Sequence, residues 1–132
     1  MKAIVSVIMG STSDLPVMKK ATDFLNEMQV PFEVNALSAH RTPEAVEAFS
    51  KGAKERGVKI IIAAAGMAAH LPGVIAASTT LPVIGVPIRS SFDGLDSLLA
   101  EFELGIVTGE SVMLTLFVML NVFFIMFDML LN

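Results

Sequence analysis

The sequence contains no cysteine, which excludes disulfide bonds and thiolate-bound metals. It also lacks the basic excess that nucleic-acid binding requires, because 9 Lys and Arg face 13 Asp and Glu, for a net charge of −4. The N-terminus enters an apolar strand pattern without a secretion signal, so a cytoplasmic protein is expected. No linker, repeat or low-complexity segment divides the chain, and residues 1–132 are expected to form a single domain.

Positive charge is missing from the C-terminal part of the chain. All 9 Lys and Arg lie at or before Arg89, and only acidic charges follow. Residues 112–131 are almost entirely apolar and have about the length of a membrane span. Burial within the domain or between sister subunits is favoured, because Asn121 interrupts the segment and no Lys or Arg flanks it. A membrane anchor and an altered C-terminal sequence stay open as alternatives.

Apolar runs alternate with helical patterns over most of the chain. Strands are predicted at 3–9, 32–37, 59–64 and 81–86, and helices at 15–28, 44–56, 71–78 and 94–103. This alternation is typical of βαβ units, and it predicts an α/β protein with three layers, α/β/α, around a doubly wound parallel sheet. Right-handed crossovers would bring the strand-to-helix loops to one edge, namely 10–14, 38–43, 65–73 and 87–93.

The first of these loops, Gly-Ser-Thr-Ser-Asp at 10–14, is a candidate phosphate cradle. Gly10 would let a ligand approach the backbone, and Ser11 and Ser13 add hydroxyl donors. Asp14 could accept hydrogen bonds from ribose hydroxyls, or it could simply cap the following helix. The segment matches neither the Walker A motif nor the dinucleotide fingerprint.

The second loop, Ser-Ala-His-Arg-Thr-Pro at 38–43, holds the densest group of reactive side chains. Thr42 suits a helix N-cap and Pro43 suits a first helical turn, so a strand-to-helix corner is predicted. Arg41 could bind phosphate in a bidentate manner, or form a surface ion pair. His40 carries the side chain that titrates nearest neutral pH, which suits proton transfer, although capping or solvation stays open.

The third loop combines small residues with the second histidine. Gly66 and Ala68 leave little side-chain bulk, which suits a flat ring or a small carboxylate against backbone amides, or simply close packing. His70 could act in catalysis, or could make a structural hydrogen bond to a neighbouring backbone group. Two histidines without a metal-ligand spacing are a poor metal site, and no metal is expected.

Five strings carry a specific resemblance: MGSTSD, LSAHRTPE, AAAGMAAHLPGVIAA, LPVIGVP and GLDSLL, in this order. Over residues 3–100 the chain resembles the class I N5-carboxyaminoimidazole ribonucleotide mutases of the aminoimidazole ribonucleotide (AIR) carboxylase family. The resemblance implies a flavodoxin-like, cytoplasmic isomerase of de novo purine biosynthesis. It would move a carboxylate from an exocyclic nitrogen to C4 of an aminoimidazole ribonucleotide, without metal or organic cofactor, as a homo-octamer. Arg41 stands where the related carboxylases usually carry Lys, which favours the mutase class.

By position, the resemblance makes His40 the catalytic proton shuttle. Arg41 would pair with the phosphate, and the loop that ends at His70 would hold the migrating carboxylate. The substrate-binding set that the resemblance implies is Ser11, Ser13, Asp14, Ser38, Arg41, Ala65, Gly66, Ala68, His70 and Leu71.

Three features depart from the family pattern. Ala64 and Met67 stand where the family usually has Gly, and residues 101–132 form an atypical apolar segment. A catalytically impaired homologue that still binds a phosphoribosyl compound or a nucleotide is therefore the alternative hypothesis.

Overall fold

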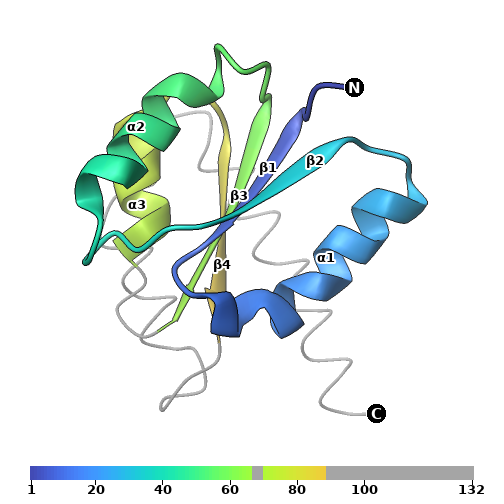
Figure 1. Ribbon diagram of the computed structural model, residues 1–132, viewed down its shortest axis with the longest axis horizontal. Helices are drawn as coiled ribbons and strands as arrows, with labels where there is room; N and C mark the ends of the chain where they lie inside the picture. Colours follow the sequence, from blue (N-terminus) through green and yellow to red (C-terminus); the bar gives the residue numbers. More distant parts are fainter. Residues whose placement is uncertain (67–69, 89–132) are drawn as a thin grey trace.

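The computed structural model describes residues 1–66 and 70–88 (Figure 1). The predicted helix at 94–103, the apolar segment 112–131, and Met67 and Ala68 lie outside the described residues. Within the described part of the chain, no helix is both long enough and apolar enough to cross a membrane.

The described strands form one parallel sheet. They are β1 (Val5–Met9), β2 (Phe32–Ala36), β3 (Ile60–Gly66) and β4 (Val83–Ile88). Their order is β2-β1-β3-β4, and every neighbouring pair runs parallel. The sequence-based prediction of a doubly wound parallel sheet is thereby confirmed, and the strand order is that of flavodoxin-like proteins.

The helices cover both faces of the sheet (Figure 1). A short 3₁₀ helix, η1 (Thr12–Asp14), leads into α1 (Leu15–Glu27), which covers one face. The opposite face carries α2 (Pro43–Ala53) and α3 (His70–Ala77). The chain moves outward from β1 to β2 and then returns past β1 to β3, so right-handed crossovers place α1 and α2 on opposite sides.

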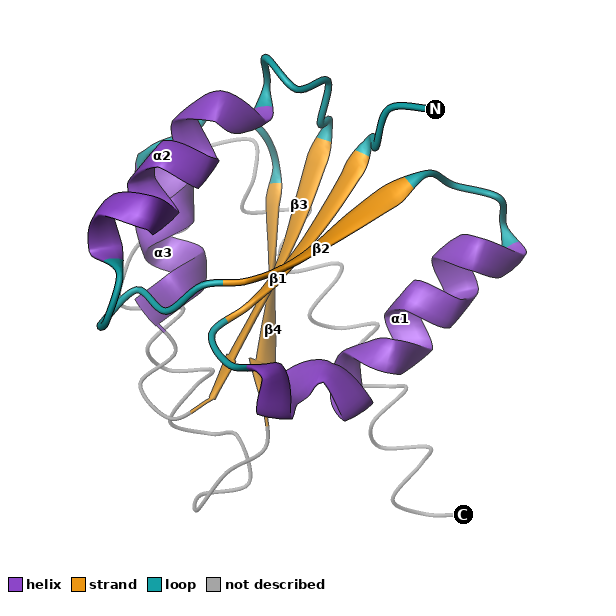
Figure 2. Cartoon of the chain, in the orientation of Figure 1, coloured by secondary structure: helices purple, strands orange, loops and turns teal. Residues whose placement is uncertain are grey.

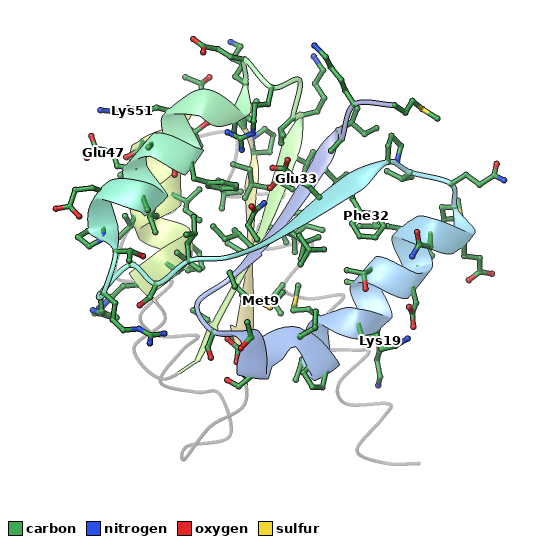
Figure 3. All side chains as sticks on the ribbon, viewed as in Figure 1. Met9, Lys19, Phe32, Glu33, Glu47 and Lys51 are labelled. Carbon is green, nitrogen blue, oxygen red and sulfur yellow. The ribbon has the colours of Figure 1, made fainter. Side chains whose placement is uncertain are left out.

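Alternating side chains of the strands fill two apolar layers. On the α1 side, Val7 and Met9 of β1 pack with Met18 and Leu25 of the helix. On the other side, a second cluster packs β1 and β3 against α2 and α3, with buried members Ile8, Val46, Phe49, Ala53, Val58, Ile61, Ala63, Ala65, Leu71, Ile75 and Val83. Figure 3 shows the same alternation on β2, where Phe32 lies towards α1 and Glu33 lies towards α2.

The fourth strand differs from its prediction. A loop was expected from residue 87, because proline has no backbone N–H and commonly ends a strand. Pro87 and Ile88 instead belong to β4, where they lie opposite Ala65 and Gly66 of β3. The prediction was wrong here because β3 itself continues to Gly66, two residues beyond its expected end, and β4 follows it.

Candidate active site

The carboxyl ends of β1, β2 and β3 meet at one edge of the sheet, and the loops after β1 and β2 leave from that edge (Figure 2). The amide of Leu37 donates to the carbonyl of Met9 at 2.9 Å, and the amide of Gly10 donates to the carbonyl of Ala64 at 3.2 Å. The chain leaves β1 towards one face and β2 towards the other. In open α/β sheets, ligands commonly bind at the carboxyl ends of the strands, near the point where the strand order reverses.

Ser11 and Ser13 are joined by their side chains in the loop after β1. The Ser11 hydroxyl caps η1 by accepting the backbone N–H of Ser13 at 3.2 Å, and the Ser13 hydroxyl donates to it at 2.9 Å. Ser13 is exposed and Ser11 is half-buried. The two predicted binding residues therefore form one polar unit whose local contacts fix the turn.

Asp14 occupies the N-cap position of α1, but its side chain makes no capping hydrogen bond. Its backbone amide instead donates to the carbonyl of Ser11 at 3.1 Å. Burial raises the pKa of the Asp14 carboxyl, while the backbone hydrogen bond involving Ser11 lowers it by a smaller amount. The capping interpretation is not supported by a contact, and the carboxylate keeps its acceptor capacity for a ligand.

Gly10 leaves room in front of the backbone. A Cβ atom built at this position has no neighbouring atom within 4 Å. Its φ is not positive, since Gly57 is the one glycine in that region among the described residues. Neither packing nor backbone conformation therefore demands glycine at position 10. The open space in front of Gly10 leaves its backbone accessible to a ligand.

Hydrogen bonds between Ser38 and Thr42 close the turn between β2 and α2. The Ser38 carbonyl accepts the amide of Thr42 at 2.9 Å and its hydroxyl at 3.0 Å, and the Ser38 hydroxyl accepts the amide of Arg41 at 3.2 Å. Thr42 holds the N-cap position, but its side chain does not cap the helix. This role of Thr42 was missed in the sequence, although a Ser and a Thr four residues apart in a turn could have suggested it.

The turn that Ser38 and Thr42 close presents two side chains to solvent. His40 and Arg41 are both exposed. Within the described part of the chain, the Arg41 guanidinium makes no ion pair or side-chain hydrogen bond, so the surface ion-pair interpretation finds no partner there. An exposed guanidinium on a fixed turn is available to bind an anion.

The two histidines meet across the site. His70 Nδ1 lies 3.3 Å from His40 Nε2, and the ring centroids are 5.1 Å apart at an interplanar angle of 62°. His70 is the first residue of α3, so the contact joins the loop after β2 to the start of that helix. The alternative interpretation, a structural hydrogen bond of His70 to a backbone group, finds no support among the described residues, where its ring contacts the other imidazole instead.

The remaining predicted residues are Ala65 and Gly66 at the end of β3, Leu71 in α3, and Ala68. Ala65 is buried in β3, and the side chain of Leu71 lies in the apolar core, so only their backbone groups remain for a ligand. A Cβ atom at Gly66 would lie 3.6 Å from Cβ of Ile88, an ordinary packing distance. Ala68 lies outside the described residues.

The structure thus brings together part of the predicted set. His40 and His70 are in contact, and Ser38 fixes the backbone beside them. No hydrogen bond among the described residues joins the Ser11–Ser13 pair or Asp14 to the histidines, although all lie at the same edge of the sheet. In residues 1–66 and 70–88, no cluster of three or more His, Asp or Glu side chains is placed to hold a metal ion.

The fold and the position of these loops define a flavodoxin-like α/β protein with its polar loops gathered at the carboxyl edge of the sheet. The chain belongs to the AIR carboxylase family, whose sequence model matches residues 4–114.

Individual relatives agree with this assignment. The chain is 60% identical over 104 residues to the N5-carboxyaminoimidazole ribonucleotide mutase of Pyrococcus horikoshii, covering 78% of this chain and 59% of the relative. It is 56% identical over 105 residues to the Bacillus subtilis protein of the same name, covering 79% of this chain and 65% of the relative. The chain therefore spans about three fifths of the length of these relatives.

A solved structure supports the fold. The crystal structure of Treponema denticola PurE superimposes with a TM-score of 0.64 at 22% sequence identity, covering 94% of each chain.

Proposed function

We propose that this protein is a mutase that converts N5-carboxyaminoimidazole ribonucleotide to its C4-carboxylated isomer. The observation that carries the proposal is the paired His40 and His70 at the carboxyl edge of a flavodoxin-like sheet, in a chain 60% identical to a mutase over 104 residues. The whole activity is a proposal for this chain, because it matches only part of the length of such relatives.

The substrate would lie at the carboxyl edge of the sheet, between the loops after β1 and β2. Arg41 would bind the phosphate, since its guanidinium is exposed and has no side-chain partner within the described part of the chain. The Ser11–Ser13 pair and Asp14 would bind the ribose-phosphate from the other side. The backbone of Gly66 and the start of α3 would hold the carboxylate.

His40 would move the single proton that the isomerisation requires. In the first step the N–C bond of the carbamate breaks, carbon dioxide leaves, and protonated His40 gives its proton to the exocyclic nitrogen. In the second step C4 attacks the retained carbon dioxide, and neutral His40 takes the proton from C4. The protonated form of His40 is thereby restored, and no proton is gained or lost overall.

The ring itself makes this chemistry feasible. C4 of an aminoimidazole is enamine-like and already nucleophilic, so the enzyme needs only to confine carbon dioxide, orient it and supply one acid–base group. The end of β3 carries only small residues, so little side-chain bulk would lie beside the ring.

We also propose that the protein works in the cytoplasm as a homo-oligomer, with the family octamer as its specific form. The support is an apolar stripe on α1, where Val17, Phe24 and Met28 are 52%, 60% and 59% exposed. Their spacing places them on one side of the helix, next to its buried face. Association of subunits would remove this surface from water.

The test is an activity assay with two substrates. A mutase converts N5-carboxyaminoimidazole ribonucleotide directly, whereas a carboxylase converts aminoimidazole ribonucleotide supplied with bicarbonate or carbon dioxide. We expect the first reaction to be much the faster at matched concentrations. Faster conversion of the second substrate pair would make the protein a carboxylase. Tight binding of either substrate without conversion would support the impaired homologue.

A further inference from the structure

We infer that His70 is a positioning residue that holds Nε2 of His40, so that His40 exchanges the substrate proton through Nδ1. The inference rests on the proposed function for its role in catalysis. The hydrogen-bond pattern that it assigns exists in the ligand-free protein and can be measured there.

The geometry selects which ring atoms take part. His70 Nδ1 lies 3.3 Å from His40 Nε2, and the rings meet edge to face at 62°. Within residues 1–66 and 70–88, His40 Nδ1 has no hydrogen-bond partner. Contacts of this length are common in catalytic sites without substrate and shorten when the site is occupied. Nδ1 is therefore the atom of His40 that remains open to a substrate.

The chemistry selects the direction of the hydrogen bond. If His40 accepts a proton at Nδ1, its neutral form carries a proton at Nε2 and donates it to Nδ1 of His70. Protonation of His40 leaves this N–H in place, so the same hydrogen bond exists in both states of the catalytic cycle. The opposite direction, with His70 as donor, would be lost each time His40 became protonated.

The hydrogen bond from His40 to His70 is stronger when His40 is protonated. A hydrogen bond donated by a cationic imidazole is stronger than one donated by a neutral imidazole. His70 therefore accepts the same hydrogen bond, in its stronger form, while His40 holds the proton that goes to the exocyclic nitrogen. His70 itself is held with Nδ1 unprotonated and its own proton at Nε2, as is required of an acceptor.

The position of each ring has a structural cause. His40 is carried on the turn that Ser38 and Thr42 close, and His70 begins α3, whose second residue, Leu71, is anchored in the core. Neither residue needs the other to fix its backbone. The contact between the rings can therefore be removed without removing the support of either loop.

The chain contains only two histidines, which allows a direct test by nuclear magnetic resonance. Long-range proton–nitrogen spectra of the ligand-free protein at about pH 8, where free histidine is neutral, report where each ring carries its proton. We expect both rings to carry it at Nε2, and the Nε2 proton of His40 to be protected from exchange with water. A proton at Nδ1 of His40, or an Nε2 proton of His40 without protection, would overturn the inference.

Two substitutions supply the matched comparison. His70→Asn keeps a carbonyl oxygen close to the position of Nδ1, whereas His70→Leu has similar bulk and no acceptor. We expect His70→Leu to lose the protected signal and to lower kcat about tenfold or more, with KM within about threefold. His70→Asn should recover most of both. Equal activity of the two variants, or a protected His40 signal in the leucine variant, would contradict the inference.

The two arms separate this inference from the proposed function. If the wild-type protein has no mutase activity but shows the protected Nε2 proton, the proposed function fails and the assigned hydrogen bond stands. If it is an active mutase without the protected proton, the inference fails alone. Thermal unfolding of both variants shows that each is folded when it is compared.

Discussion

Ser6, the second residue of β1, donates its hydroxyl proton to Oε1 of Glu33 on the neighbouring strand at 2.8 Å. The serine is fully buried, and Arg56 approaches the same carboxylate oxygen from the surface at 3.2 Å. The Glu33 carboxylate is only partly buried, so water can hydrogen-bond to it if the Ser6 hydroxyl is removed. If the carboxylate is removed instead, the fully buried Ser6 hydroxyl is left without a partner.

This asymmetry predicts unequal effects of removing the two partners. Ser6→Ala should lower the free energy of unfolding by about 0.5–1.5 kcal/mol, the net worth of one hydrogen bond. Glu33→Leu leaves a buried hydroxyl unpaired and should cost more, about 1–3 kcal/mol. Urea unfolding monitored by circular dichroism measures both. The double variant should cost less than the sum, and strict additivity would show that the two groups do not interact.

Asp14 gives a prediction that depends on pH. Burial raises the pKa of its carboxyl, so the folded protein disfavours the ionised form, and the carboxyl's contribution to stability is lost as pH rises through that pKa. Asp14→Asn cannot ionise and should therefore raise the melting temperature at neutral pH. The gain should shrink as pH falls through the raised pKa of Asp14 and disappear below the ordinary value of 3.8, where this carboxyl is neutral in both the folded and the unfolded protein. A gain of the same size at acid pH would show that charge is not its cause.

A substitution at Gly10 distinguishes an effect on packing from an effect on ligand binding. The space in front of its backbone should accept the methyl group of Gly10→Ala without loss of stability, and restriction of the unfolded chain should add a few tenths of a kcal/mol. If a ligand approaches this backbone, the same methyl group should weaken ribonucleotide binding. Thermal unfolding and calorimetric titration measure the two effects. Unchanged affinity in a stable variant would move the ligand away from Gly10.

Arg41 should contribute mainly to binding of the phosphate. Arg41→Ala should weaken ribonucleotide binding by about 1.5–3 kcal/mol, the usual range for a hydrogen bond to a charged group. Arg41→Lys keeps the charge but loses the planar guanidinium group. Its affinity for the ribonucleotide should lie between those of the wild-type protein and Arg41→Ala. The corresponding nucleoside, which has no phosphate, should bind equally to all three proteins. A matching loss for the nucleoside would mean that Arg41 contacts another part of the ligand.

Most of the fold could be predicted because its signals are local. The apolar run 3–9 marks β1, whose residues are all buried, the run 32–37 marks the more exposed β2, and the proline at position 43 correctly marks the start of α2. The end of β4 could not be predicted in this way, since Pro87 is held in the strand by its register with β3. Register is a tertiary property that one strand does not encode alone.

The sequence names candidate site residues but does not specify their contacts. The sequence places His40 and His70 on separate loops, and only the parallel sheet brings them within 3.3 Å. Capping by Asp14 and Thr42 was a reasonable prediction from residue type, but neither side chain caps its helix, and the Thr42 hydroxyl donates to the Ser38 carbonyl instead. Short-range competition of this kind depends on angles that residue type does not specify.

The central claim is that His40 carries the proton in a carboxylate-moving site. The most direct measurement compares turnover of N5-carboxyaminoimidazole ribonucleotide by the wild-type protein and by His40→Asn, with substrate affinity measured on both. We expect the wild-type protein to convert the substrate, and the variant to bind it within a few fold while losing most of the turnover. Near-normal turnover by His40→Asn would contradict the assignment of the proton carrier and the mechanism built on it.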